Sequence, residues 1–288
     1  MNHLASRLSG LAQRLGLHGR SPRQILDAAS VLRLRVVPMP GSEPSIDWQH
    51  ATPWHRLTEL PRDALAGPVQ EDKANARAAL IRTMTRSERP ATVDLRDVEG
   101  VVSTDSAVGA FATFDDFLAN RTDRTVRIIS FNDFEKALKL AFPAGTEHAI
   151  YQARQASWRH SGVFLDGVEH VEALACVVIY ARRRALEIPL TVQTTRYAFS
   201  DSGLRNLSAR YYAIAFAPES WSNPAFLSLL VESGAPYARL APLGSGDGTE
   251  YLMLPKSSAE AAALGEGLLL AGMGNLVAHL QSLHLADL

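Results

Sequence analysis

The stretch WRHSGVFLDGVEHVEALACVVIYARRR, residues 158–184, joins the pattern of a strand to the pattern of a helix. The letters HSGVFL predict a β-strand, and the residues after it predict a helix that begins with a capping box of Asp166 and Glu169. Glutamates fill the first turns and Arg182–Arg184 the last, which is the order that the helix dipole favours. Because ALACVVIYA is apolar on every face, we expect this helix to be buried.

The same stretch contains the single cysteine of the chain, Cys176. Six residues separate it from His170, so the two side chains would lie about 120° apart on a helix and cannot pair. Burial in an apolar helix raises the pKa of a thiol, which argues against a nucleophile. One cysteine also excludes an intramolecular disulfide and a cysteine-rich zinc site.

Strand and helix patterns alternate through residues 160–240. Among them, PLTVQTTRYAF predicts a strand, and NPAFLSLLVES predicts a helix that Asn223 caps and that ends at Gly234. PYARLAPL and EYLMLP then predict a hairpin across GSGDGT, whose glycines do not have the spacing of a phosphate loop. The predicted fold class is α/β to α+β, with a mixed β-sheet and flanking helices. We predict two regions: 1–90, with helices, one strand and a proline-rich irregular segment, and 91–288, the main α/β domain with a long C-terminal helix.

The N-terminal region is basic, since residues 1–37 hold six arginines and one acidic residue. Leucines recur with helical spacing at Leu4, Leu8, Leu11 and Leu15. This amphipathic helix is expected to dock on the core or on a protein partner, with targeting or membrane-surface contact as alternatives. SPRQILDAAS predicts a second helix capped by Ser21, and the alternating VLRLRVVP predicts a half-exposed strand.

Further patterns predict helices over EDKANARAALIRTMT, the second half of 104–122, FNDFEKALKLAF and EHAIYQARQA, and strands over ATVDL and TVRIIS. A last long helix is expected to run from Ser257 to the C-terminus. Its glycines at 265, 267, 272 and 274 weaken a helix, so close packing must compensate. The packing partner is either the sheet or, as the alternative, the same helix in a homodimer.

Candidate binding residues fall in two places. The proline-rich segment 38–68 contains WQHATPWH, which offers Trp48, His50, Trp54 and His55 as a binding loop, or as anchors that hold the segment on the core. Their spacing matches no metal site. A second patch of Arg159, His160 and Arg196 is expected near strand ends, where open α/β sheets place ligands; a solvated loop is the alternative.

Composition narrows the function further. The net charge of −1 does not favour nucleic acid, and Glu266 and Asn275 interrupt the most apolar helix, so no transmembrane span is expected. Arginine supplies 25 of the 29 basic residues, which suggests a GC-rich bacterial or phage genome and weakens any arginine cluster as a sign of anion binding. We expect a cytoplasmic protein without cofactor or metal.

No catalytic motif is present, and no catalytic residue is predicted. The sequence therefore favours a non-catalytic binding or interaction protein. The alternative is an enzyme that acts on a small polar or anionic substrate at the strand ends around His160 and Arg196, with the proline-rich segment as a lid.

Overall fold

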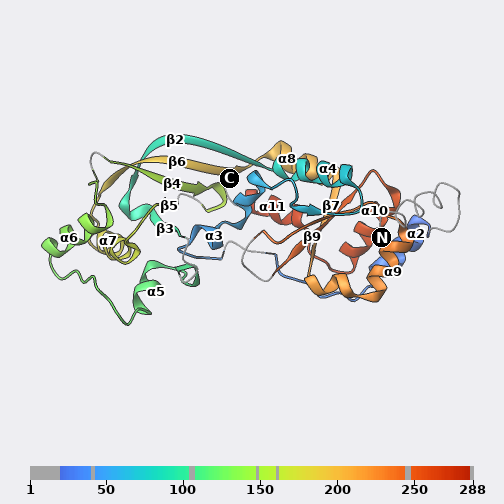
Figure 1. Ribbon diagram of the computed structural model, residues 1–288, viewed down its shortest axis with the longest axis horizontal. Coiled ribbons are helices and arrows are strands. Elements are labelled where there is room, and N and C mark those ends of the chain that lie inside the picture. Colours follow the sequence, from blue (N-terminus) through green and yellow to red (C-terminus); the bar gives the residue numbers. More distant parts are fainter. Residues whose placement is uncertain are drawn as a thin grey trace. The chain divides into compact units, whose positions relative to one another are not determined.

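The computed structural model describes residues 20–39, 43–103, 108–146, 149–159, 162–243 and 248–285. The described parts of Met1–Gly41, Arg56–Met84 and Phe199–Ala286 form one compact unit, and those of Ser42–His55 and Thr85–Ala198 form the other. Both contain a sheet flanked by helices, so the fold is α+β (Figure 1). The division at residue 90 stays a prediction, whereas each compact unit combines segments that are separated in sequence.

The second unit is built on a five-stranded mixed sheet. Its strands, in the order β2-β6-β4-β5-β3, are β2 (Met84–Asp94), β6 (Pro189–Phe199), β4 (Ile150–Ala156), β5 (Val163–Asp166) and β3 (Val98–Val102). β4 is parallel to β6 and β3 is parallel to β5, but β4 and β5 are antiparallel. The mixed sheet predicted from the sequence is confirmed.

Helices cover one face of this sheet. They are α5 (Phe114–Ala119), α6 (Phe131–Ala141) and α7 (Val171–Arg184), of which α5 and α6 both pack against α7 (Figure 1). The core includes Leu165 and Val192 from the sheet and Leu174 and Val178 from α7. Because strand side chains alternate, Phe164 points to the other face, where the short helix α3 (Trp48–Ala51) packs.

The edge strand β3 is covered by residues 45–47. The Val101 amide donates to the Ile46 carbonyl at 2.7 Å, and Asp47 forms a parallel bridge with Val101. A Cβ atom at Gly100 would lie 2.1 Å from the Ile46 carbonyl oxygen, so only glycine allows this approach. The segment therefore completes the sheet edge, which would otherwise expose unpaired backbone groups.

The first unit has a four-stranded antiparallel sheet in the order β1-β8-β9-β7, formed by Leu65–Ala66, Ala238–Leu240, Glu250–Pro255 and Tyr211–Phe216. Its helices are α2 (Pro22–Ser30), α4 (Gln70–Ile81), α8 (Asp201–Arg210), α9 (Pro224–Ser233), α10 (Ala259–Leu270) and α11 (Leu276–Leu285). Cβ atoms at Gly265 and Gly267 would lie 2.6 Å from Tyr212 and 2.5 Å from Ala29. The glycines of α10 thus permit close packing within this unit.

Short 3-10 helices connect the elements at Pro53–Glu59, Leu95–Asp97, Val108–Ala110, Ser157–Arg159 and Pro218–Ser222. No helix in the described part of the chain is both long and apolar enough to cross a membrane.

Several elements with local start and stop signals are confirmed. α2 has the predicted capping box of Ser21 and Gln24, and α9 has Asn223 as N-cap and Gly234 after its end. The hairpin of β8 and β9 and the predicted bounds of β6 are also confirmed. These features depend on residues close together in sequence, which is why the sequence alone sufficed.

Five predictions about elements are wrong. VLRLRVVP and TVRIIS form no strand, because neither pairs with another strand. EHAIYQARQA contains β4 rather than a helix, since β6 supplies a parallel partner. The C-terminal helix is two helices, broken at Gly272, whose φ is +87°. The N-cap of α7 is His170, not Asp166, and its side chain makes no capping hydrogen bond.

Three predicted features lie outside the described residues: the amphipathic helix over 1–16, His160, and the hairpin tip 244–247.

Candidate functional site

The two tryptophans of the WQHATPWH segment are fully buried. Trp48 and Trp54 have no exposed surface, and His55 is 8% exposed. The Trp48 ring lies 5.2 Å from His55, 5.4 Å from Phe164 and 5.5 Å from Tyr197, measured between ring centroids. This packing agrees with the anchoring alternative, in which the tryptophans hold an irregular segment on the sheet.

His50 is more accessible than the two tryptophans and His55, but it pairs with a buried carboxylate. Its Nδ1 lies 2.7 Å from Oδ2 of Asp47, a residue only 3% exposed. The other Asp47 oxygen accepts the Ser103 amide at 3.2 Å. The pair thus ties α3 to the end of β3, and the described residues contain no group of three or more potential metal ligands.

Arg159 and Arg196 do not converge. The Arg159 guanidinium pairs with Glu99 at 3.2 Å and lies 5.9 Å from the centre of the Phe164 ring. Arg196 stands opposite Gln155 in the register of β4 and β6, next to Tyr197. Since consecutive strand residues face opposite sides, Arg196 points away from the face that holds Tyr197, Phe164 and Trp48. A binding role for these residues stays a prediction.

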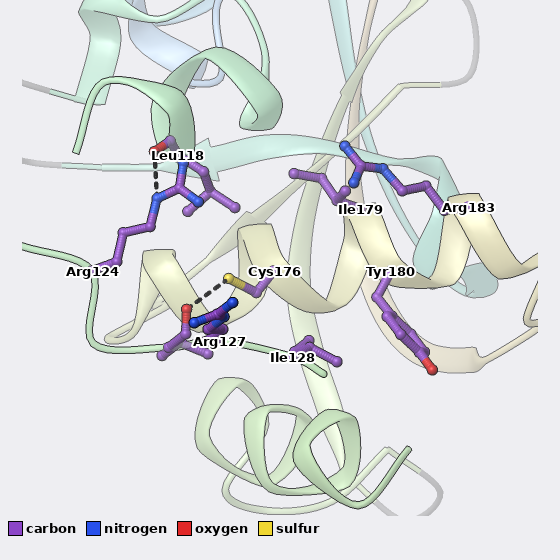
Figure 2. A pocket seen from close by; sticks show the side chains of 9 residues that line it. Leu118, Arg124, Arg127, Ile128, Cys176, Ile179, Tyr180 and Arg183 are labelled. Atoms are coloured by element: carbon purple, nitrogen blue, oxygen red, sulfur yellow. Dashed lines mark hydrogen bonds between the residues drawn. The ribbon is translucent and has the colours of Figure 1, made fainter. Parts of the chain in front are cut away.

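A different pocket lies along the outer face of α7. It has a volume of about 590 Å³, within the range typical of ligand sites. It is lined by nine residues: Leu118, Arg124, Val126, Arg127, Ile128, Cys176, Ile179, Tyr180 and Arg183 (Figure 2). We call it the arginine pocket, because three arginines surround a largely apolar floor.

The charge of the arginine pocket is positive. Arg124 donates from Nε to the Leu118 carbonyl oxygen at 2.8 Å, which does not neutralise its charge. Arg183 pairs with Asp115 at 2.8 Å, but both side chains are largely exposed. In the described part of the chain, Arg127 has no carboxylate partner. Figure 2 shows the three guanidinium groups at separate positions around Cys176 rather than at one point.

The apolar part of the site extends beyond the pocket. The Tyr180 ring stacks on Phe134 of α6 with 4.9 Å between centroids, and Phe131 contacts Phe134 in turn. Ile129, next to the pocket residue Ile128, is 74% exposed, and Phe131 is 56% exposed. Large exposed apolar side chains beside a cationic hollow are typical of a binding surface.

The Cys176 thiol is mostly protonated at neutral pH, and therefore a poor nucleophile. Burial and the nearby Glu172 raise the pKa of its thiol to about 11, against a smaller lowering by Arg124. Its Sγ lies 3.7 Å from the Val126 carbonyl oxygen, to which it donates. The prediction of a raised pKa is confirmed, and the pocket therefore lacks an activated thiol nucleophile.

One wall of the arginine pocket comes from residues 121–130, which we call the arginine strap. It carries Arg121, Arg124 and Arg127 and forms neither helix nor strand. Arg121, Thr125 and Val126 of the strap also line a second hollow of about 410 Å³, and Val126 lines both hollows. The strap thus contributes to two cavities over α7.

The sequence did not single out the arginine pocket. The sequence RTDRTVR does indicate a cluster of positive charge, because it has an arginine at every third position from 121 to 127. The alternation in TVRIIS suggested a strand instead, and arginine is the common cation throughout this chain. Arg183 lines the same pocket as the strap only through the fold, and no local sequence pattern indicates this.

The chain matches DUF6685, a family of unknown function, over residues 87–287. This range includes the arginine strap and α7. No curated protein and no solved structure matches the chain.

Proposed function

The chain belongs to the DUF6685 family, and we propose that it is a non-catalytic binding protein whose arginine pocket holds an acidic segment of a partner protein. The observation that carries the proposal is the combination of three arginines with an apolar floor in one pocket of about 590 Å³. A positively charged pocket favours a negatively charged partner. Burial of an apolar side chain on the apolar floor of the pocket adds affinity that charge alone does not provide.

The positions of the arginines favour a peptide over a single small anion. An isolated phosphate or carboxylate is best held by donors that converge on it, as in a bidentate arginine pair. Here Arg124, Arg127 and Arg183 occupy separate points around Cys176 (Figure 2). A segment with several carboxylates around one apolar side chain fits this distribution, because the apolar side chain can rest on Ile179 and Tyr180.

The enzymatic alternative has less support. Among the pocket residues, Cys176 is the strongest potential nucleophile, and its raised pKa keeps the thiol protonated at neutral pH. The Arg159 guanidinium lies near the Phe164 ring, whereas the strand register points Arg196 to the opposite face of the sheet, which does not support a shared substrate patch. Four further predictions from the sequence stay part of the proposal: binding of a protein partner through the basic N-terminal helix, a homodimer, a bacterial origin and a cytoplasmic location.

The proposal is tested by selecting a random peptide library on the immobilised full-length protein, and in parallel on the double variant R124E/R127E. We expect the wild-type protein to enrich acidic peptides with an apolar residue, and the double variant to lose them. The control is Arg205→Glu, which reverses the charge of one exposed arginine on α8, away from the arginine pocket. Enrichment of neutral or basic peptides, or equal enrichment by the double variant, would contradict the proposed function.

A further inference from the structure

The arginine strap has no main-chain support of its own over most of its length. Within the described residues, 122–128 make no hydrogen bond from main chain to main chain. At the far end of the strap, the amides of Ile129 and Ser130 donate to Asp133 on α6. The segment that carries Arg124 and Arg127 must therefore be held by side chains.

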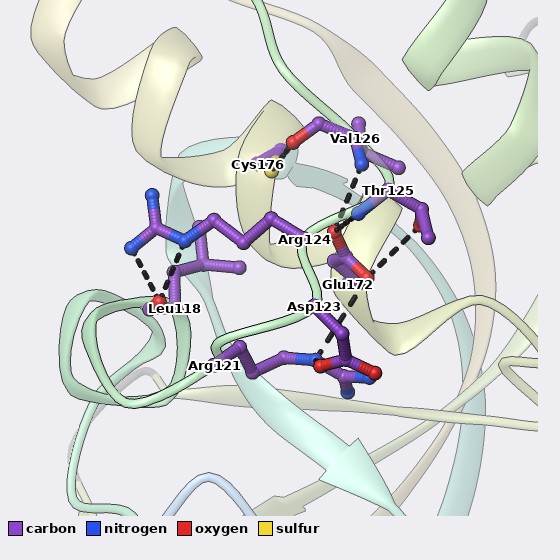
Figure 3. Close-up of polar contacts among 8 residues, drawn as sticks. All are labelled: Leu118, Arg121, Asp123, Arg124, Thr125, Val126, Glu172 and Cys176. Carbon is purple, nitrogen blue, oxygen red and sulfur yellow. Dashed lines mark hydrogen bonds and ion pairs between the residues drawn. The ribbon is translucent and has the colours of Figure 1, made fainter.

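Glu172, in the first turn of α7, provides that support (Figure 3). Its carboxylate accepts the Thr125 amide at 2.7 Å, the Val126 amide at 2.9 Å and the Thr125 hydroxyl at 3.1 Å. The side chain of Glu172 is only 11% exposed. Three hydrogen bonds to one ionised acceptor form a strong local attachment, because charge-assisted bonds exceed neutral ones in strength.

Two neighbouring contacts are weaker. Arg121 Nε lies 3.9 Å from Glu172 and 3.7 Å from Asp123, distances that allow attraction between charges but not hydrogen bonds. The Cys176 thiol, one turn further along α7, is a weak donor to the Val126 carbonyl oxygen. The Arg124 side chain is held separately, by hydrogen bonds to the Leu118 carbonyl oxygen. The position of the Thr125 and Val126 backbone thus depends chiefly on Glu172.

The protonation state of Glu172 agrees with this role. Burial alone would raise its pKa, but hydrogen bonds from Val126 and Thr125 outweigh burial, and the pKa lies below its ordinary value. The carboxylate is therefore ionised at neutral pH and accepts all three hydrogen bonds.

We propose that Glu172 is the positioning residue of the arginine pocket: it holds the strap on α7 and thereby fixes Arg124 and Arg127 where an anionic ligand meets them. Glu172 does not line the arginine pocket itself. The part of the inference that concerns ligand affinity rests on the proposed function, whereas the attachment of the strap does not.

The test compares the full-length wild-type protein with Glu172→Ala and Glu172→Gln. The first readout is amide hydrogen exchange of the peptide that covers 121–130, followed by mass spectrometry. We expect exchange at the Thr125 and Val126 amides to rise by about tenfold or more in Glu172→Ala, in line with the loss of bonds to a charged acceptor. Glu172→Gln should be intermediate, since its amide oxygen still accepts.

The matched control is Glu169→Ala. Glu169 is exposed, precedes the same helix and lines the same second hollow, but makes no hydrogen bond to the strap among the described residues. Its removal changes the net charge equally and should leave exchange of the strap unchanged. Unchanged exchange in Glu172→Ala, or an equal rise in Glu169→Ala, would overturn the attachment.

The second readout is the affinity for an acidic peptide enriched by the wild-type protein. Loss of a negative charge alone should strengthen binding of an acidic ligand, as expected for Glu169→Ala. In Glu172→Ala, displacement of Arg124 and Arg127 should instead weaken binding of the acidic peptide by about tenfold. Unchanged or tighter binding of the peptide to Glu172→Ala would overturn the positioning role of Glu172. If the wild-type protein enriches no acidic peptide, the proposed function and the predicted effect on affinity are both wrong. The attachment of the strap by Glu172 is still tested by hydrogen exchange in that case.

Discussion

At the scale of single residues, Cys176 shows how burial decides the chemistry of a thiol. Arg124 lies close enough to lower its pKa, yet burial and the negative charge of Glu172 outweigh that effect. The sequence predicted this outcome because the residue falls in the middle of an apolar helix. The environment of Trp48 and Trp54 was less predictable, since proline-rich segments can either expose or bury their aromatic residues, and the contacts that bury them come from Phe164 and Tyr197.

Because the pKa of the Cys176 thiol is raised, we expect the thiol to react slowly with alkylating agents at neutral pH. In the folded protein, the rate of alkylation by iodoacetamide should rise about tenfold per pH unit and level off only near pH 11. The control is the same protein unfolded in urea, where the rate should level off near the ordinary value of 9.0. A plateau in the folded protein below pH 9 would show that the thiol is activated.

At the scale of secondary-structure elements, the arginine strap explains one failure of sequence analysis. TVRIIS alternates as a strand does, but a strand requires a partner strand. Here the carboxylates of Glu172 and Asp133 accept the backbone amides of the strap instead. In contrast, α2 and α9 were predictable, because their caps are local. β4 was not, because its partners β5 and β6 come later in the sequence.

The covered edge of β3 gives a prediction about stability. A methyl group at Gly100 would lie 2.1 Å from the Ile46 carbonyl oxygen and 2.8 Å from Phe164. Gly100→Ala should therefore lower the free energy of unfolding by about 3 kcal/mol or more, because backbone atoms have to move, as measured by urea titration. It should also expose the Trp48 segment, which a red shift of tryptophan fluorescence would report.

The comparison for that substitution is Gly167→Ala. Apart from its own residue and the two adjacent residues, no atom lies within 4 Å of the added methyl group, so the destabilisation arises only from a φ of +68°. We expect Gly167→Ala to lower the free energy of unfolding by about 1 kcal/mol. Equal stabilities of the two variants would contradict the close approach of residues 45–47 to β3.

At the scale of the whole molecule, two compact units with separate cores are each assembled from distant segments. The fold class was predictable, because hydrophobic periodicity and caps identify most elements. The grouping of segments into units was not, since residues 42–55 join a sheet formed mainly by residues beyond 84. The arginine pocket has the same property: Leu118, the strap and α7 meet only in the folded chain.

Binding of an acidic segment in the arginine pocket is measured by isothermal titration calorimetry with charge-reversed variants of the protein and of the peptide. An acidic peptide enriched by the wild-type protein is titrated into wild-type protein, Arg127→Glu and Arg205→Glu. We predict that Arg127→Glu weakens binding by about tenfold or more, that Arg205→Glu does not, and that lysine in place of one peptide glutamate restores binding to Arg127→Glu. Equal affinity of wild-type protein and Arg127→Glu for the acidic peptide would contradict binding in the arginine pocket.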